Sequence, residues 1–197
     1  MSASRTPDHP VDPQFFQRWS PRAFTGEALD RASLMTVLEA ARWAPSSFNS
    51  QPWRFIYGLA GTPAFDAIFG ALAPVNQSWT QRAGALVLLV SRTKWIPPNG
   101  TELAPLGSAA FDTGAAWMSI ALQAEKMSLK AHAIGGYDRD AMRAALQVPA
   151  DHALHAVVAL GRQGPKDVLT PDQQAREAPN ARQPLAKLVA EGRFSFD

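Results

Sequence analysis

The chain contains no cysteine among its 197 residues. This excludes disulfides, thiolate nucleophiles, CxxC redox pairs and cysteine-ligated iron–sulfur clusters. Any redox chemistry must therefore come from a bound cofactor. Histidine is also scarce, with four residues that form neither an HExxH motif nor a tight His/Asp cluster, so we expect no metal site. The GxGxxG, GxxxxGK[ST] and GxSxG patterns are missing as well.

Charged residues and long apolar runs are limited too. Charged residues make up 18% of the chain and the formal net charge is +2, without a block of like charges, so we expect no nucleic-acid partner. The first ten residues lack an apolar segment, and we expect no signal peptide. The longest apolar run, from Ala83 to Val90, is too short to span a bilayer. We therefore expect no membrane partner and a cytoplasmic location.

Length and composition fit one domain with a sizeable core. Hydrophobic residues make up 46% of the chain, and so many apolar residues beside so few charges favour an oligomer. Residues 1–12 contain two prolines and are predicted to form a flexible N-terminal arm, followed by a single domain over 13–197. The tail from Pro165 is polar and rich in proline.

Hydrophobic periodicity and capping residues predict a mixed α/β architecture. The expected helices cover 13–19, 30–43, 62–70, 108–130 and 138–147, and the expected strands cover 53–59, 83–91, 131–134 and 154–161. The longest helix is apolar nearly all round, which predicts burial on more than one side. Residues 92–107 carry three prolines and predict a long loop that is either a lid or flexible.

Arg18, Ser20 and Arg22 form the first candidate site. Pro21 disfavours the α region for Ser20, so the segment is predicted to be extended, with Ser20 and Arg22 on the same side. Guanidinium groups bind phosphate in a bidentate manner, and a hydroxyl adds a donor. The alternative is a helix end that carries two solvated arginines.

Two other segments carry ligand-like chemistry. Ser46, Ser47, Asn49 and Gln51 could bind a polyol or the edge of a heterocycle, or could simply form a turn. Gly135-Gly136 would let a ligand ring approach the backbone, or would form a β-to-α turn.

Four aromatic or imidazole side chains need separate interpretation. We expect His132 and His155, on predicted strands, to be hydrogen-bonded structural residues. Trp79 and Trp95 fall in predicted loops, which makes them candidates for stacking on a ligand.

Several motifs occur together in the order of a known family. They are the RxSxR element, the PSSxNxQPWxF element at 45–55, Asn76-Gln77-Ser78-Trp79, the apolar helix at 112–129, and Ile134 to Asp138, followed by ALGR at 159–162 and NARQPL at 180–185. In these motifs the chain resembles the FMN-dependent nitroreductase family over almost its whole length.

The resemblance implies an α+β fold with a mixed, mainly antiparallel sheet flanked by helices, in an intertwined homodimer. The long helix would pack at the two-fold axis. Residues 165–197 would form a C-terminal extension that crosses onto the partner subunit and extends its sheet. Each of two FMN sites would be built from both subunits.

The resemblance also assigns roles by position. Arg18, Ser20 and Arg182 would contact the FMN phosphate, and Arg22 would lie near the flavin pyrimidine. The other cofactor-binding positions are Pro45, Ser46, Ser47 and Asn49 from the partner subunit, Asn76 at the pyrimidine or ribityl chain, and Gly135 and Gly136 along the ring near N5. Trp79 and Asn180 depart from the family, because some members carry a lysine and a second phosphate-binding base there.

The activity implied is transfer of hydride from NADH or NADPH, through flavin N5, to a nitro compound, a quinone or a related small electrophile. The resemblance assigns no side chain as a catalytic acid or base. One alternative is a flavin-binding or storage protein with little turnover, and another is an interaction module that keeps the fold without the cofactor.

Overall fold

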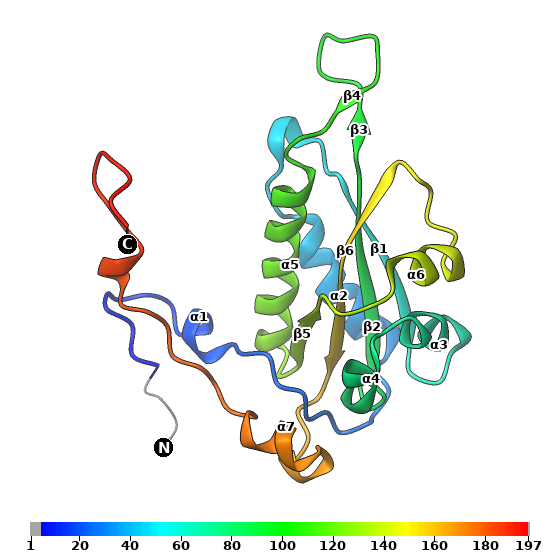
Figure 1. Ribbon diagram of the computed structural model, residues 1–197, viewed down its shortest axis with the longest axis vertical. Helices are drawn as coiled ribbons and strands as arrows, with labels where there is room; N and C mark the ends of the chain where they lie inside the picture. The colour runs from blue at the N-terminus through cyan, green and yellow to red at the C-terminus, as the bar shows by residue number, and fades with distance from the viewer. Residues whose placement is uncertain (1–4, 197) are drawn as a thin grey trace.

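A four-stranded antiparallel sheet forms the centre of the structure, a computed structural model that describes residues 5–196 (Figure 1). The strand order is β1-β2-β6-β5. The bounds are Trp53–Leu59 for β1, Ala85–Arg92 for β2, Lys130–Ile134 for β5 and His152–Gly161 for β6. All four predicted strands are therefore confirmed, with ends that differ by at most two residues from the expected ranges.

Seven helices are found in the described part of the chain. They are α1 (Gln14–Gln17), α2 (Arg31–Arg42), α3 (Pro63–Gly70), α4 (Pro74–Thr80), α5 (Ala109–Lys126), α6 (Arg139–Ala145) and α7 (Pro171–Ala175). Short 3-10 turns cover Ser47–Asn49, Lys166–Val168 and Leu185–Lys187. All five helices expected from the sequence are present.

Side-chain caps explain where three of these helices begin. Asp30 accepts a hydrogen bond from the Ser33 main-chain N–H at the start of α2, and Thr62 does the same for Phe65 at the start of α3. Asp138 accepts from two main-chain N–H groups of α6. Each cap satisfies donors that have no partner inside the helix, as the sequence predicts.

The two faces of the sheet bury separate clusters of side chains. Strand residues alternate between the faces, so Leu86 and Leu88 pack on one side while Val87 and Leu89 pack on the other. Helices α3, α4 and α6 cover the first face, and α2 and α5 cover the second (Figure 1). The β5 strand, at the edge of the sheet, forms one wall of the candidate site.

Two sequence expectations about loops are wrong. Trp79 lies in α4 rather than in a loop and is 2% exposed, so its ring packs in the core and does not stack on a ligand. The sequence does not predict helix α4 because Ala73, its N-cap residue, has no side chain that could cap the helix. The 92–107 segment is not entirely a loop, because it contains a short hairpin of β3 (Lys94–Trp95) and β4 (Ala104–Pro105).

Helix α5 is buried on one side only within this chain. Ala116 and Ile120 are fully buried, whereas Phe111 is 84% exposed and Met118 is also exposed. The burial on several sides that the sequence predicts is therefore not provided by one chain. An apolar face of this kind usually marks an interface.

The two ends of the chain contact each other beside the main body (Figure 1). The Leu185 main-chain N–H donates to Asp8 Oδ2 at 2.7 Å. Residues 5–12 thus run along the C-terminal tail, and the flexibility expected for residues 1–12 stays a prediction. Leu188, Val189 and Phe194 of the tail are exposed.

Candidate functional site

A polar cavity of about 210 Å³ brings together four of the residues singled out in the sequence: Arg18, Ser20, Arg22 and Arg182. It lies where the extended segment after α1 meets β5 and the tail. Arg5, Trp19, His132, Arg176, Ala178 and Asn180 complete its lining. Arg18 and Arg182, from opposite ends of the chain, therefore face the same space.

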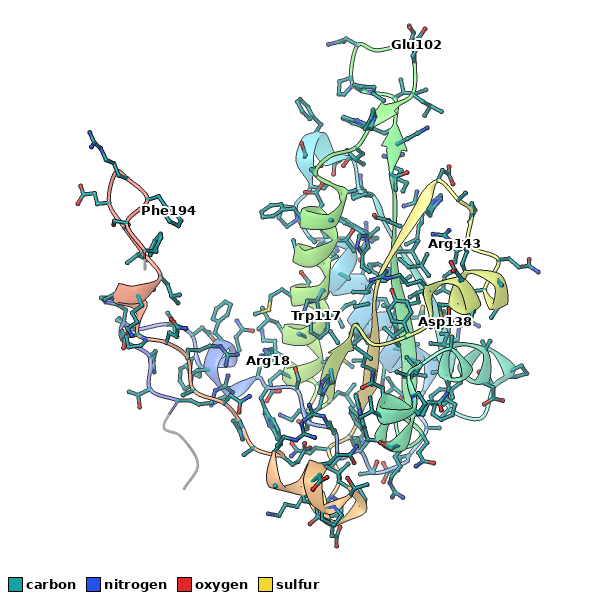
Figure 2. All side chains as sticks on the ribbon, in the orientation of Figure 1. Arg18, Glu102, Trp117, Asp138, Arg143 and Phe194 are labelled. Carbon is teal, nitrogen blue, oxygen red and sulfur yellow. The ribbon has the colours of Figure 1, made fainter. Side chains whose placement is uncertain are left out.

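The segment after α1 brings Arg18, Ser20 and Arg22 to the same cavity. Arg18 has an extended backbone at φ −60° and ψ 128°, which ends α1. Its Nη1 atom donates to Ser20 Oγ at 3.3 Å, so the guanidinium and the hydroxyl lie side by side. Figure 2 shows Arg18 between α1 and the lower part of α5.

Three arginines, Arg5, Arg18 and Arg182, form what we call the guanidinium cluster. The Arg5 side chain donates to the Arg18 carbonyl oxygen at 3.0 Å, and Arg182 donates to two neighbouring carbonyl oxygens. Among residues 5–196, no carboxylate forms an ion pair with any of the three. Their hydrogen bonds go to neutral acceptors, so the positive charge is left uncompensated.

The pKa values of Arg5 and Arg18 are both lowered by burial and by neighbouring positive charge. Burial, and then the positive charges of Arg5 and Arg182, lower the pKa of the Arg18 guanidinium. Burial and the charge of Arg182 lower the pKa of Arg5 in the same way. The Glu125 carboxylate opposes both shifts, but it already binds Lys130 Nζ at 2.8 Å. A dianion in the cavity would relieve the repulsion.

Arg22 is held by Glu177, a residue that sequence reasoning missed. Glu177 Oε1 accepts hydrogen bonds from the main-chain N–H groups of Arg22 and Ala23 at 2.7 and 2.8 Å. Its Oε2 atom is buried, accepts no hydrogen bond from residues 5–196, and lies 3.9 Å from Arg22 Nη1. A single carboxylate in a polar tail gives no sequence signal for this contact.

His132 lines the polar cavity, and the core residue Trp79 packs against its ring. The ring centroids of the two residues lie 4.7 Å apart, and His132 Nδ1 lies 2.9 Å from the Pro21 carbonyl oxygen. Burial lowers the pKa of His132, which keeps the imidazole neutral near pH 7. His155 has a partner too, because its Nε2 lies 2.8 Å from Ser91 Oγ. Both histidines are thus the hydrogen-bonded residues that the sequence predicts.

Asn76 and Gly136 also lie together, beyond the end of β5. Asn76 Nδ2 donates to the Gly136 carbonyl oxygen at 2.8 Å. A Cβ on Gly136 would lie 2.7 Å from the same nitrogen, so a side chain at this position would displace the Asn76 amide from its hydrogen bond. A Cβ on Gly135 would meet nothing within 4 Å, which leaves its backbone open to a ligand. Neither glycine nor Asn76 lines the polar cavity itself.

A groove continues from the polar cavity along β5 and α5. A neighbouring cavity of about 490 Å³ shares Arg18, Ser20 and His132 with it and adds Trp117 of α5. A further cavity of about 260 Å³ shares Trp117 and Ala133 and reaches His155. The groove thus combines a cationic end at Arg18 with apolar lining from Trp117 and Ala133, which suits a ligand with one anionic end.

The segment Pro45 to Asn49 does not join this groove in the same chain. The Ser47 main-chain N–H donates to Asp112 Oδ2 at 3.2 Å, and Ser108 Oγ donates to the same oxygen at 2.9 Å. These contacts fix the segment at the N-terminal end of α5, whereas β5 follows its C-terminal end. Trp95 contacts Phe48, with ring centroids 6.0 Å apart, so it packs on this segment.

Two other classes of site are not seen in the described residues. Within 5–196 no group of three or more His, Cys, Asp or Glu side chains is placed to hold a metal ion. None of the helices in that range is both long and apolar enough to cross a membrane.

Comparison with known proteins gives consistent matches. The sequence profile described as "Nitroreductase family" matches residues 16–57. A solved structure described as "the oxidoreductase containing FMN" is 40% identical, covers 100% of both chains and superposes with a TM-score of 0.94. A "putative nitroreductase in complex with FMN" from Desulfovibrio desulfuricans is 24% identical, covers 94% of this chain and 100% of its own, and has a TM-score of 0.73.

A curated relative from Rhodopseudomonas palustris (strain TIE-1) is described as "Putative NADH dehydrogenase/NAD(P)H nitroreductase". It is 24% identical over 140 residues, which covers 68% of this chain and 71% of that protein. The antiparallel sheet with helices on both faces is the α+β nitroreductase fold. The protein is an oxidoreductase by class. The chain belongs to the nitroreductase family.

Proposed function

We propose that the protein is an FMN-dependent oxidoreductase that passes reducing equivalents from NADH or NADPH to a nitro compound, a quinone or a related small electrophile. The observation that carries this proposal is the convergence of Arg18 and Arg182 on one cavity, where no carboxylate of residues 5–196 forms an ion pair with either. Relatives with the same fold contain FMN, according to their descriptions. Bound FMN would supply the redox chemistry, accepting and donating hydride at N5.

The residues of the polar cavity fit a phosphate and a ring system. Arg18, Ser20 and Arg182 would bind the phosphate through charge-assisted hydrogen bonds. Arg22, held in place by Glu177, would lie near the pyrimidine and stabilise negative charge there when the ring is reduced. Trp79 is buried against His132 and has no positive charge, unlike the lysine found in some family members. Arg22 would therefore supply the positive charge near the pyrimidine.

The remaining residues would position the ring. Asn76 holds the Gly136 carbonyl with its Nδ2 atom, which leaves Oδ1 to accept a hydrogen bond from the pyrimidine. Gly135 and Gly136 would line the ring near N5 with backbone groups. No side-chain acid or base is assigned, because the nearest imidazole, His132, is bound to the Pro21 carbonyl.

The proposal includes a homodimer. The exposed apolar face of α5 and the exposed tail would be covered by a partner subunit. In that arrangement Pro45, Ser46, Ser47 and Asn49, held at the far end of α5, would reach the site of the other subunit. A cytoplasmic location stays a prediction from the sequence.

Stopped-flow reduction of the holoprotein tests the proposed activity. We expect the flavin absorbance to bleach within seconds on mixing with NADH or NADPH, and to return on addition of a quinone or nitroarene. Flavin that stays oxidised for minutes with both nucleotides would contradict turnover and would support a storage function instead.

A further inference from the structure

We propose that Arg5, in the N-terminal arm, is a third guanidinium of the phosphate site and couples the arm to the bound phosphate. The inference rests on the proposed function, because it takes the anion in the polar cavity to be the phosphate of FMN. It adds a residue outside the RxSxR element and the tail, which are the two segments that the sequence indicates.

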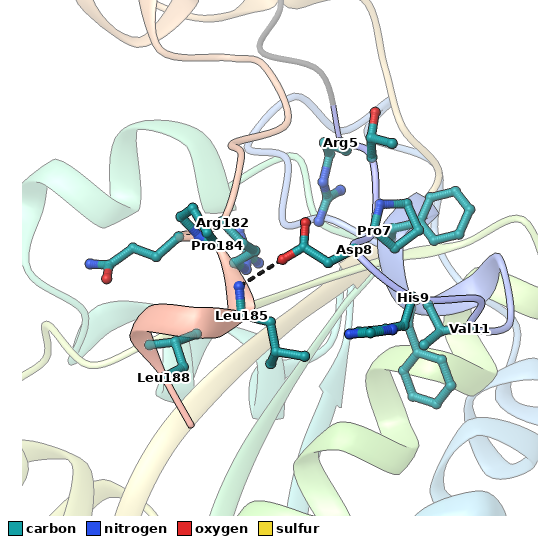
Figure 3. Close-up of a pocket in the computed structure, with 13 residues that line it drawn as sticks. Arg5, Pro7, Asp8, His9, Val11, Arg182, Pro184, Leu185 and Leu188 are labelled. Carbon is teal, nitrogen blue, oxygen red and sulfur yellow. Dashed lines mark hydrogen bonds between the residues drawn. The ribbon is translucent and has the colours of Figure 1, made fainter. Parts of the chain in front are cut away.

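The position of Arg5 is set by contacts at both ends of the arm. Arg5 Nη1 donates to the Arg18 carbonyl oxygen at 3.0 Å, which anchors the arm to the end of α1. Three residues later, Asp8 Oδ2 accepts the hydrogen bond from the Leu185 main-chain N–H at 2.7 Å. Figure 3 shows Arg5 and Asp8 of the arm beside the tail, with the hydrogen bond between Leu185 and Asp8 as a dashed line. The arm thus runs from the polar cavity to the tail.

Arg5 also lines the polar cavity together with Arg18 and Arg182. One Nη atom is used by the Arg18 carbonyl, and a guanidinium has five N–H donors, so several remain for a second acceptor. Phosphate oxygens accept several hydrogen bonds at once, so one phosphate can bind three guanidinium groups that approach from different segments.

Repulsion between Arg5 and the other two guanidinium groups favours binding of an anion. After burial, the charge of Arg182 lowers the pKa of Arg5, and the charges of Arg5 and Arg182 lower the pKa of Arg18, so the positive charges repel one another across the cavity. Their common carboxylate neighbour, Glu125, is bound to Lys130. A phosphate dianion placed between the three would replace this repulsion by attraction.

Arg5 should affect the selectivity of the site for FMN over riboflavin. Arg5 interacts with the phosphate end of the ligand, whereas the ring would lie along β5 and α5. Loss of Arg5 should therefore weaken binding of FMN but not of riboflavin, which has the same ring and ribityl chain without the phosphate.

The test measures dissociation constants for FMN and riboflavin by quenching of flavin fluorescence, with apoprotein variants. We expect Arg5→Ala and Arg5→Gln to weaken FMN binding by about ten- to a hundredfold, and riboflavin binding by less than about twofold. Gln keeps a neutral amide donor without the positive charge of the guanidinium. Arg5→Lys should retain much of the FMN affinity, and Arg31→Ala, an exposed arginine at the start of α2, serves as the control.

Each outcome has a distinct meaning. Unchanged FMN affinity in Arg5→Ala and Arg5→Gln, with a wild-type protein that binds FMN, would overturn the role of Arg5 and leave the proposed function intact. An equal loss for FMN and riboflavin would also overturn it, because the arm would then act on the fold of the whole site. A wild-type protein that binds neither flavin would sink the proposed function itself.

Discussion

Glu177 binds Arg22 across 155 residues of sequence, with Oε1 2.7 Å from the Arg22 main-chain nitrogen. The Glu177 side chain is only 2% exposed, so this contact brings a buried negative charge under the extended segment after α1. It fastens the start of the C-terminal tail to the segment that carries Arg18, Ser20 and Arg22. The shape of the polar cavity therefore depends on the tail as much as on the RxSxR element.

Replacing Glu177 tests how much this contact stabilises the fold. Glu177→Ala leaves two inward-facing N–H groups without their acceptor, and we expect a loss of about 1–3 kcal/mol in the free energy of unfolding. Glu177→Gln keeps a carbonyl acceptor and should lose less. Urea unfolding measures both, with the exposed Glu191→Ala as control. A Glu177→Ala protein as stable as the wild type would show that the contact contributes nothing.

Arg18 should carry a large part of the affinity for FMN. Arg18→Ala removes a charge-assisted hydrogen bond to the proposed phosphate, and the dissociation constant should rise by an amount that corresponds to about 1.5–3 kcal/mol. Arg182→Ala should behave similarly. Equilibrium dialysis against FMN provides the measurement, and an unchanged dissociation constant in Arg18→Ala would remove that residue from the site.

Asp112 should matter for the Pro45 to Asn49 segment. Its Oδ2 atom accepts from Ser47 and Ser108, and the residue is 3% exposed. Asp112→Ala should therefore lower stability by about 1–3 kcal/mol, while Ser108→Ala should cost less, because Ser47 keeps its acceptor. Thermal unfolding compares the two. Equal stability of Asp112→Ala and the wild type would show that the segment is held by other contacts.

His132 should make stability depend on pH. Burial lowers its pKa in the folded state below the ordinary value of 6.5, so the unfolded chain binds a proton first as the pH falls. Stability should be fully present above about pH 6.5 and should decline as the pH falls toward the folded-state pKa. His155, whose pKa burial also lowers, adds a slope of the same sign.

Urea unfolding between pH 5 and 7.5 measures this effect. We expect His132→Gln to have a shallower decline than the wild type, and the exposed His9→Gln to match the wild type. Identical slopes for wild type and His132→Gln would contradict a buried, neutral imidazole at this position.

The exposed face of α5 predicts a dimer. Light scattering should give twice the chain mass of 21.3 kDa at micromolar concentration. Phe111→Glu places a charge on the most exposed apolar side chain of α5 and should shift the protein toward monomer, whereas the exposed Phe194→Glu in the tail should have a smaller effect. A stable wild-type monomer would contradict both the dimer and a site shared by two subunits.

Much of the fold can be predicted from the sequence because its signals are local. The caps at Asp30, Thr62 and Asp138 mark helix starts, and the apolar runs mark the buried strands. Helix α4 lacks such a cap and begins at Pro74, which by itself is as typical of a loop. The burial of Trp79 follows from that helix and could not be predicted without it.

The site is predictable only in part for the same reason. The RxSxR element is local, so its extended shape and common orientation follow from Pro21 and strand geometry. Arg5 and Glu177 contribute through contacts with segments far away in the chain, and isolated charged residues in polar segments give no sign of such contacts. The pairing of Asn76 with the Gly136 carbonyl is a further contact of this kind.

Titration of the purified apoprotein with FMN, followed by the visible spectrum, measures whether the polar cavity binds this cofactor. We expect saturable binding of about one FMN per chain, a yellow holoprotein after removal of free ligand, and a bathochromic or structured change in the flavin band as the ring leaves water. A protein that stays colourless and leaves the FMN spectrum unchanged at saturating concentrations would contradict the proposed function.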